Sequence, residues 1–134
     1  MRISLNGAAL LLVSCAGAIT ALGDTLFPSE SLSAGLSADL SSTAHFLIRL
    51  RTIHPVLAVM ASLYMMGSVW QSAGARPFGR KLARSLTILI VCQLALGAVN
   101  VMLLAPVSVQ LLHLLLADLV WVGYVMLAAD SLAV

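Results

Sequence analysis

The chain has 134 residues, of which 61% are hydrophobic and 9% are charged, and its formal net charge is +2. A soluble domain carries about a quarter charged residues, so this composition excludes an ordinary water-soluble globule and gives no basic face for nucleic acid. The two cysteines, Cys15 and Cys92, lie inside apolar segments without CxxC spacing and indicate neither a disulfide nor a metal site. We therefore expect an all-α integral membrane protein in contact with lipid.

The first apolar segment covers residues 4–22. Its length suffices for a helix that crosses about 30 Å of hydrocarbon. A secretory signal is the alternative, because Leu12 to Cys15 looks like a lipoprotein cleavage box. The apolar stretch continues past Cys15 to Leu22, which favours a membrane span.

The connection after this span covers residues 23–43 and contains acidic residues but no Lys or Arg. Within it, Leu32, Leu36 and Leu40 recur every four residues. This spacing predicts a short amphipathic helix that lies on the bilayer surface.

Three more spans follow, at about 44–71, 82–104 and 107–130, so residues 1–134 form one four-span domain. The short connection between the second and third spans is basic, with Arg76, Arg80, Lys81 and Arg84. The positive-inside rule places this connection, and with it both termini, in the cytoplasm. Arg49 and Arg51 break the rule, because they lie at the opposite edge.

The stretch RLRTIHPVLAV places His54 just after these two arginines, and His113 lies about six residues into the fourth span. Both histidines therefore fall in the same leaflet on separate helices. Such imidazoles can hold haem iron between them, and haem propionates need cations at the aqueous edge. Arg51 precedes His54 by one helical turn, so Arg51, with Arg49 nearby, is the predicted propionate ligand.

Pro55 allows two local geometries, because it cannot donate a hydrogen bond to the carbonyl of Arg51. Either the second helix begins here, or an earlier helix from about Ala44 kinks here. The kink places His54 deeper in the membrane and is the geometry that we favour.

Two other polar groups have more than one interpretation. His45 is out of phase with His54 and is read as an interfacial residue or a guard of a porphyrin edge. Asp118, the only acid deep in a span, could relay protons, but we favour a structural pairing with Gln93 or Asn100.

Four segments in order, GAITALGDTLFP, HFLIRLRTIHPVLAV, QLALGAVNVMLLAP and LLHLLLADLVW, resemble the second half of bacterial heme A synthases. Members of that family contain two four-helix halves and oxidise a methyl group of haem O. The resemblance implies a bacterial plasma membrane protein in which the residues that match the family's haem b ligands are His54 and His113.

The family's first half, which carries a carboxylate thought to act in the reaction, has no counterpart in this sequence, so catalysis by this chain alone is in doubt. A fragment, a separately encoded half that binds a first-half subunit, and a single repeat that pairs with a second copy all remain open. We expect a haem-binding bundle that acts in haem A biosynthesis. The alternatives are a non-enzymatic b-type cytochrome and a structural subunit without a cofactor.

Overall fold

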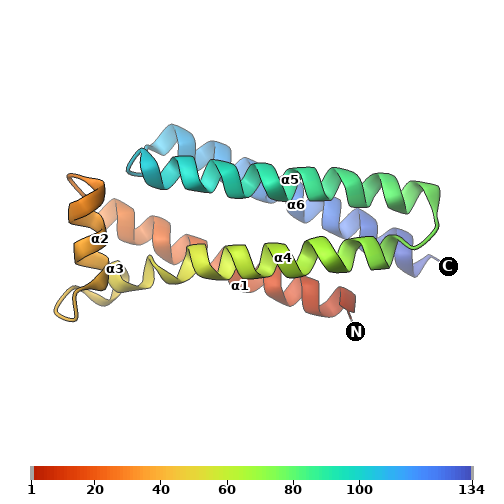
Figure 1. Ribbon diagram of the computed structural model, residues 1–134, viewed down its shortest axis with the longest axis horizontal. Helices are drawn as coiled ribbons and strands as arrows, with labels where there is room; N and C mark the ends of the chain where they lie inside the picture. The colour runs from red at the N-terminus through yellow and green to blue at the C-terminus, as the bar shows by residue number, and fades with distance from the viewer. Residues whose placement is uncertain (1, 134) are drawn as a thin grey trace.

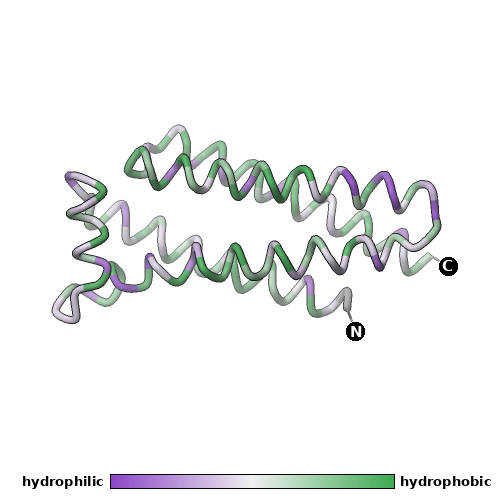
Figure 2. Tube along the Cα trace, in the orientation of Figure 1, coloured by the Kyte–Doolittle hydropathy of each residue, from purple (hydrophilic) through white to green (hydrophobic). Residues whose placement is uncertain are grey.

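The computed structural model describes residues 2–133, with side chains described from residue 4 onward, and all its regular elements are helices. Four of them are long and apolar enough to span a membrane: Ser4–Leu26, Phe46–Ala73, Pro77–Met102 and Val107–Leu132. The predicted four-helix membrane bundle is thus confirmed. Hydrophobic residues dominate the helices along their length, and hydrophilic residues gather toward the two ends (Figure 2).

The helices form two antiparallel pairs that lie over each other (Figure 1). In one pair, α1 (Arg2–Leu26) packs on α4 (Ile53–Ala73), and in the other α5 (Pro77–Met102) packs on α6 (Val107–Leu132). Contacts between α4 and α5 join the two pairs. Both chain termini lie toward the end that carries the α4–α5 connection, which we call the basic end, and Figure 1 shows α2 at the opposite end, the α2 end.

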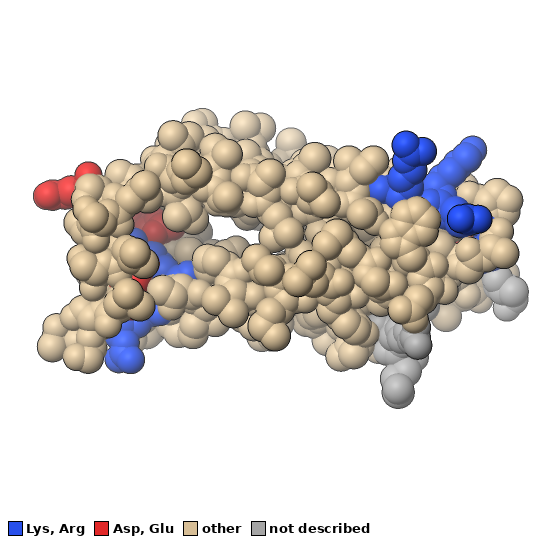
Figure 3. Space-filling view, viewed as in Figure 1, with Lys and Arg blue, Asp and Glu red and all other residues tan. Residues whose placement is uncertain are grey.

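The sequence suggested that the third long helix begins near Leu82, but this helix begins at Pro77. Proline suits the first helical position, because its missing N–H would have no intrahelical partner there. Most of the basic residues of the predicted connection therefore lie on the first turns of α5, where they form a cluster of cations (Figure 3). Arg76 closes this end of the bundle through an ion pair with Asp130 of α6, at 2.8 Å.

The short helix predicted in the first connection is present as α2 (Leu32–Leu40). The hydroxyl of Ser31 caps it by accepting a hydrogen bond from the backbone N–H of Ala34. Figure 1 shows α2 lying across the bundle, roughly perpendicular to the long helices. Gly35 faces the protein, whereas all three leucines of the predicted stripe are exposed, as expected of a helix at a membrane surface.

The main cluster of buried hydrophobic residues lies at the basic end of the bundle. It consists of Met65, Val69, Ala73, Ala83, Leu86, Ile90, Val120, Tyr124 and Leu127. Toward the α2 end, by contrast, residues 53–64 and 91–119 include no buried residue. Figure 3 shows an opening between the two helix pairs in this direction. The helices are thus closely packed at one end and separated toward the other.

Candidate functional site

His54 lies at the start of α4, immediately after a break in the helix. The chain forms α3 (Phe46–Leu50), turns at Arg51 and Thr52, and resumes as α4 at Ile53. Pro55 has no backbone N–H and cannot donate the helical hydrogen bond to the carbonyl of Arg51, and the interruption falls at this position. The structure therefore combines the two predicted geometries, because a helix precedes the break, as in the favoured one, and a new helix begins at Ile53, as in the alternative.

The imidazole of His54 is half-buried against Gly17 of α1. A Cβ atom at Gly17 would lie only 3.0 Å from Cε1 of this ring. The glycine thus provides the room that the ring occupies between α1 and α4.

His113 has the matching environment in the other helix pair. It is half-buried on α6, and a Cβ atom at Gly97 of α5 would lie 3.1 Å from its Cε1. The side-chain amide of Gln93, one turn away on α5, lies 3.3 Å from Nε2 and can donate a hydrogen bond to it. Each histidine is therefore seated against a glycine of the neighbouring helix.

His54 and His113 thus lie on different helix pairs, each against a glycine of its neighbouring helix. Both Nδ1 atoms are buried without a hydrogen-bond partner, an unusual state for polar atoms inside a protein. Both rings also lie in the part of the bundle that has no buried core, on helices that flank the opening in Figure 3.

These features fit a haem better than a bare metal ion. The described residues contain no group of three or more His, Cys, Asp or Glu side chains placed to hold a metal. A porphyrin supplies four nitrogen ligands itself and needs only two axial ligands from the protein. Two imidazoles from different helix pairs, each with an unpartnered Nδ1, fit that requirement.

Arg51 occupies a buried site that the sequence did not predict. Its guanidinium forms ion pairs with Asp24 of α1, at 3.0 Å, and Asp39 of α2, at 3.3 Å. It also donates hydrogen bonds to the hydroxyl of Ser29 and the carbonyl of Phe27. Burial raises the pKa of the Asp39 carboxyl above its ordinary value, and the Arg51 charge opposes this rise. Arg51 thus joins three segments at the α2 end.

Arg49 has a more open position than Arg51. It is exposed and lines a surface hollow of about 510 Å³ together with Asp39, Leu40, Phe46, Leu50, Thr52 and Ile53. Within the described part of the chain it makes no ion pair. The two arginines that the sequence grouped together therefore have different surroundings.

His45 and Asp118 also differ from their simplest interpretations. His45 caps α3, accepting a hydrogen bond at Nδ1 from the N–H of Leu47, and its ring packs on Phe27. Asp118 is exposed on α6 and pairs with neither Gln93 nor Asn100. The side-chain oxygens of both amides are buried without a partner. The expected structural pairing of Asp118 is therefore wrong.

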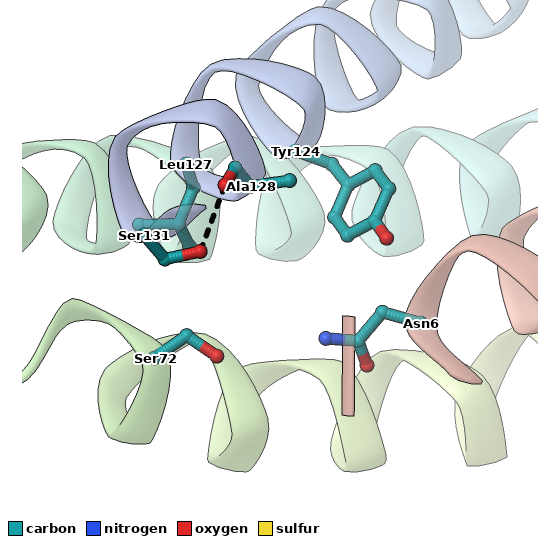
Figure 4. Close-up of a pocket in the computed structure, with 6 residues that line it drawn as sticks. All are labelled: Asn6, Ser72, Tyr124, Leu127, Ala128 and Ser131. Carbon is teal, nitrogen blue, oxygen red and sulfur yellow. Dashed lines mark hydrogen bonds between the residues drawn. The ribbon is translucent and has the colours of Figure 1, made fainter. Parts of the chain in front are cut away.

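A second cavity, at the basic end, is too small to hold a ligand. Figure 4 shows its lining residues: Asn6, Ser72, Tyr124, Leu127, Ala128 and Ser131. Its volume of about 10 Å³ corresponds to a single water molecule. Next to it, the Ser68 hydroxyl donates a 2.8 Å hydrogen bond to Oδ1 of Asn6 and links α4 to α1. This cavity belongs to the packing of the core.

Comparison with known proteins yields one family and two close relatives. Residues 4–125 match the family model described as cytochrome oxidase assembly protein (COX15-CtaA). Proteins named protoheme IX farnesyltransferase from two strains of Thermus thermophilus are 46% and 45% identical over 126 residues. Each match covers 92% of this chain but 21% of the relative, so the chain spans about a fifth of their length. No solved structure matches the chain.

Proposed function

The chain belongs to the cytochrome oxidase assembly protein family, which includes the heme A synthases, and on this basis we propose a specific role within haem A biosynthesis. In this proposal the chain is the half of a heme A synthase that binds a cofactor haem b. His54 and His113 hold the iron. The complete reaction oxidises the methyl group of haem O and requires either a first-half subunit or a second copy of the chain.

The single observation that carries the proposal is the histidine pair. Each ring comes from a different helix pair, is seated against a glycine and has a buried, unpartnered Nδ1. Haem with two imidazole ligands transfers electrons, and the residues of this chain would orient the imidazoles and exclude water from them. For His113, iron binding through Nε2 would require Gln93 to release that atom.

Arg51 is the better placed of the two predicted propionate ligands. It lies three residues before His54 and is buried, whereas Arg49 faces the surface hollow. Both of its carboxylate partners are protein groups, so a haem propionate would replace one of them at the guanidinium. Arg49 would then bind a propionate only at the exposed edge of the site.

The name of the relatives supports a role connected with haem but does not define the reaction of this chain. The printed name of the Thermus proteins refers to farnesyl transfer onto protohaem IX, and this chain matches about a fifth of each of them. We further propose that the chain resides in the bacterial plasma membrane with its basic end in the cytoplasm. The gathering of Arg76, Arg80, Lys81 and Arg84 at one end supports this orientation.

One observation favours a second candidate function, a b-type cytochrome that carries electrons without catalysing a reaction. Two imidazoles fill both axial positions of a haem and leave no iron site for a substrate. The carboxylates of Asp24 and Asp39, at the α2 end, are also engaged by Arg51, which leaves the exposed Glu30 as the carboxylate there without an ion pair to a described residue.

An absorption spectrum tests haem binding. Protein expressed with ample haem should show the bands of a low-spin, bis-imidazole haem, and His54→Ala or His113→Ala should abolish them. His45→Ala is the matched control, because His45 caps α3 and should leave the spectrum unchanged. A folded, colourless wild-type protein would contradict both haem functions.

Conversion of haem O separates the two functions. The purified chain should be tested alone and together with a first-half protein of the same family. Conversion in either setting supports the synthase, whereas a haem-loaded protein that is inactive in both supports the cytochrome.

A further inference from the structure

Two polar side chains near the histidine rings have buried oxygen atoms without a hydrogen-bond partner. These atoms are Oγ1 of Thr20 on α1 and Oδ1 of Asn100 on α5. A threonine in a helix can donate to the carbonyl four residues earlier, as Thr25 does to Ala21 at 2.8 Å. The Thr20 hydroxyl makes no such bond, and the Asn100 amide makes no hydrogen bond within the described part of the chain. Such groups are rare and costly, so each indicates a partner from outside the chain.

The two side chains occupy matching positions in the two helix pairs. Thr20 follows Gly17 by three residues, and Asn100 follows Gly97 by three residues. Residues at this spacing share one face of a helix and lie about 4.5 Å apart along its axis. Since α1 and α5 both run from the basic end toward the α2 end (Figure 1), each polar group lies closer to the α2 end than the glycine that faces a histidine ring. Each helix pair thus presents one polar group on the α2 side of its imidazole.

On α1, Thr20 lies between the level of His54 and the level of Arg51. The next turn of α1 carries Asp24, which forms the 3.0 Å ion pair with Arg51, and a Cβ atom at Gly23 would lie 3.5 Å from Cγ of that arginine. Toward the α2 end, α1 therefore meets first the imidazole, then presents the Thr20 hydroxyl, and then meets the guanidinium. A haem needs the same groups, because its iron binds imidazole and its propionates need hydrogen-bond donors and a cation.

We propose that Thr20 and Asn100 donate hydrogen bonds to the propionate carboxylates of the bound haem, one from each helix pair. The inference rests on the proposed haem site and adds two binding residues to it. A hydroxyl and an amide N–H are both donors, and hydrogen bonds to a charged carboxylate are stronger than those between neutral groups. Rotation of the Asn100 amide exchanges its oxygen for its nitrogen and so presents the donor. Because both side chains are neutral, they cost less to bury in the haem-free protein than a further cation would.

A haem titration of the full chain in detergent, followed by absorbance, provides the first test. Thr20→Val and Asn100→Leu keep the approximate shape of each side chain and remove its donor, so each should lower the affinity for haem b about tenfold. Thr20→Ser, which keeps the hydroxyl, should bind haem b as the wild type does. Thr25→Val is the matched control, because this exposed hydroxyl bonds to its own helix. Equal affinity of the wild type, Thr20→Val and Asn100→Leu for haem b would overturn the proposal.

An iron porphyrin that carries ethyl groups in place of the propionates tests the contact from the side of the ligand. It should bind the wild type, Thr20→Val and Asn100→Leu with equal affinity, because it offers no carboxylate. A loss of affinity for this porphyrin as large as that for haem b would overturn the proposal, since the two side chains would then act through packing around the rings. A wild type that binds neither porphyrin would overturn the haem site itself, and this inference with it.

Thermal unfolding of the haem-free protein gives a readout that does not involve haem. A buried polar group without a partner destabilises the fold, so Thr20→Val and Asn100→Leu should each raise the midpoint of unfolding in detergent. Replacement of a side chain that already bonds to the protein or to a buried water would lower the midpoint instead. A lower midpoint in either variant would therefore overturn the proposal for that residue, because its hydrogen bond would serve the fold.

Discussion

The two glycines behind the histidine rings determine, at the scale of single residues, whether the site can form. Gly17 and Gly97 lie on different helices, yet each leaves space for an imidazole at a distance that a methyl group would obstruct. In both cases the atom closest to the added methyl group would be Cε1 of the ring. A ring is rigid, so it can move away only by rotating about its own side-chain bonds.

Gly17→Ala and Gly97→Ala should therefore weaken haem binding by displacing His54 and His113 respectively. We expect the affinity to fall at least about tenfold, equivalent to about 1.4 kcal/mol, in a haem titration followed by absorbance. Gly67→Ala is the matched control, because no atom outside its own helix lies within 4 Å of the added Cβ. That variant should bind haem normally and gain up to about 1 kcal/mol of helix stability. Equal affinities in all three variants would contradict the role of the two glycines.

The sequence could identify the histidines but not the partners of Arg51. A histidine in an apolar span is conspicuous, and a second one at a similar depth makes a pair. The ion pair between Arg51 and Asp24, however, joins positions 27 residues apart across a connection. Acidic residues in that connection were visible in the sequence, but their number and spacing do not indicate which of them folds back onto the arginine. The exposure of Asp118 was equally hidden, because the rotation of α6 depends on how all four helices pack.

At the scale of elements, the α2 end is organised by one guanidinium. Arg51 follows α3 and precedes α4, Asp39 lies on α2, and Asp24 lies near the end of α1. The leucines of α2 face away from the bundle, so apolar packing contributes little to its position. The ion pair with Asp39 is thus the main specific contact that positions α2.

Asp39→Asn should release α2 while leaving α1 joined to Arg51 through Asp24. Loss of this partly buried pair should cost about 1 kcal/mol, or about fivefold faster hydrogen exchange of the α2 amides. Mass spectrometry of residues 32–40, in detergent or nanodiscs, measures the effect. Glu30→Gln removes an exposed acid that makes no ion pair with any described residue and should leave exchange in α2 unchanged. Identical exchange in the two variants would show that another contact positions α2.

The sequence predicted most of these elements, because apolar length and leucine spacing are local properties. The start of α5 was missed by a few residues, since the charges of Arg80, Lys81 and Arg84 suggested a connection. Charged side chains at the end of a long helix can reach water, so charge alone does not mark where a membrane helix ends. The break before α4 was predictable from Pro55 because proline acts on its own backbone neighbours.

At the scale of the whole molecule, stability and the candidate site occupy opposite ends of the bundle. The core side chains of α4, α5 and α6 all belong to the basic end, where Met65, Val69 and Leu86 are almost completely buried. The histidines lie where the same helices have no buried residues. Such a division permits a cofactor to enter one end while the other end keeps the helices together. Sequence alone could not show it, because both halves of each span are similarly apolar.

Haem should therefore protect one end of the bundle selectively. A ligand that binds only the folded site stabilises the segments that must be ordered to hold it, by an amount that grows with its concentration relative to Kd. Hydrogen exchange should slow in residues 53–64, 91–102 and 107–119 when haem is added. Exchange in residues 65–73, 83–90 and 120–127, which contain the core, should change little. His113→Ala treated with the same haem is the control and should show no change at either end. Protection spread evenly along the helices, or confined to the basic end, would show that haem binds elsewhere than between His54 and His113.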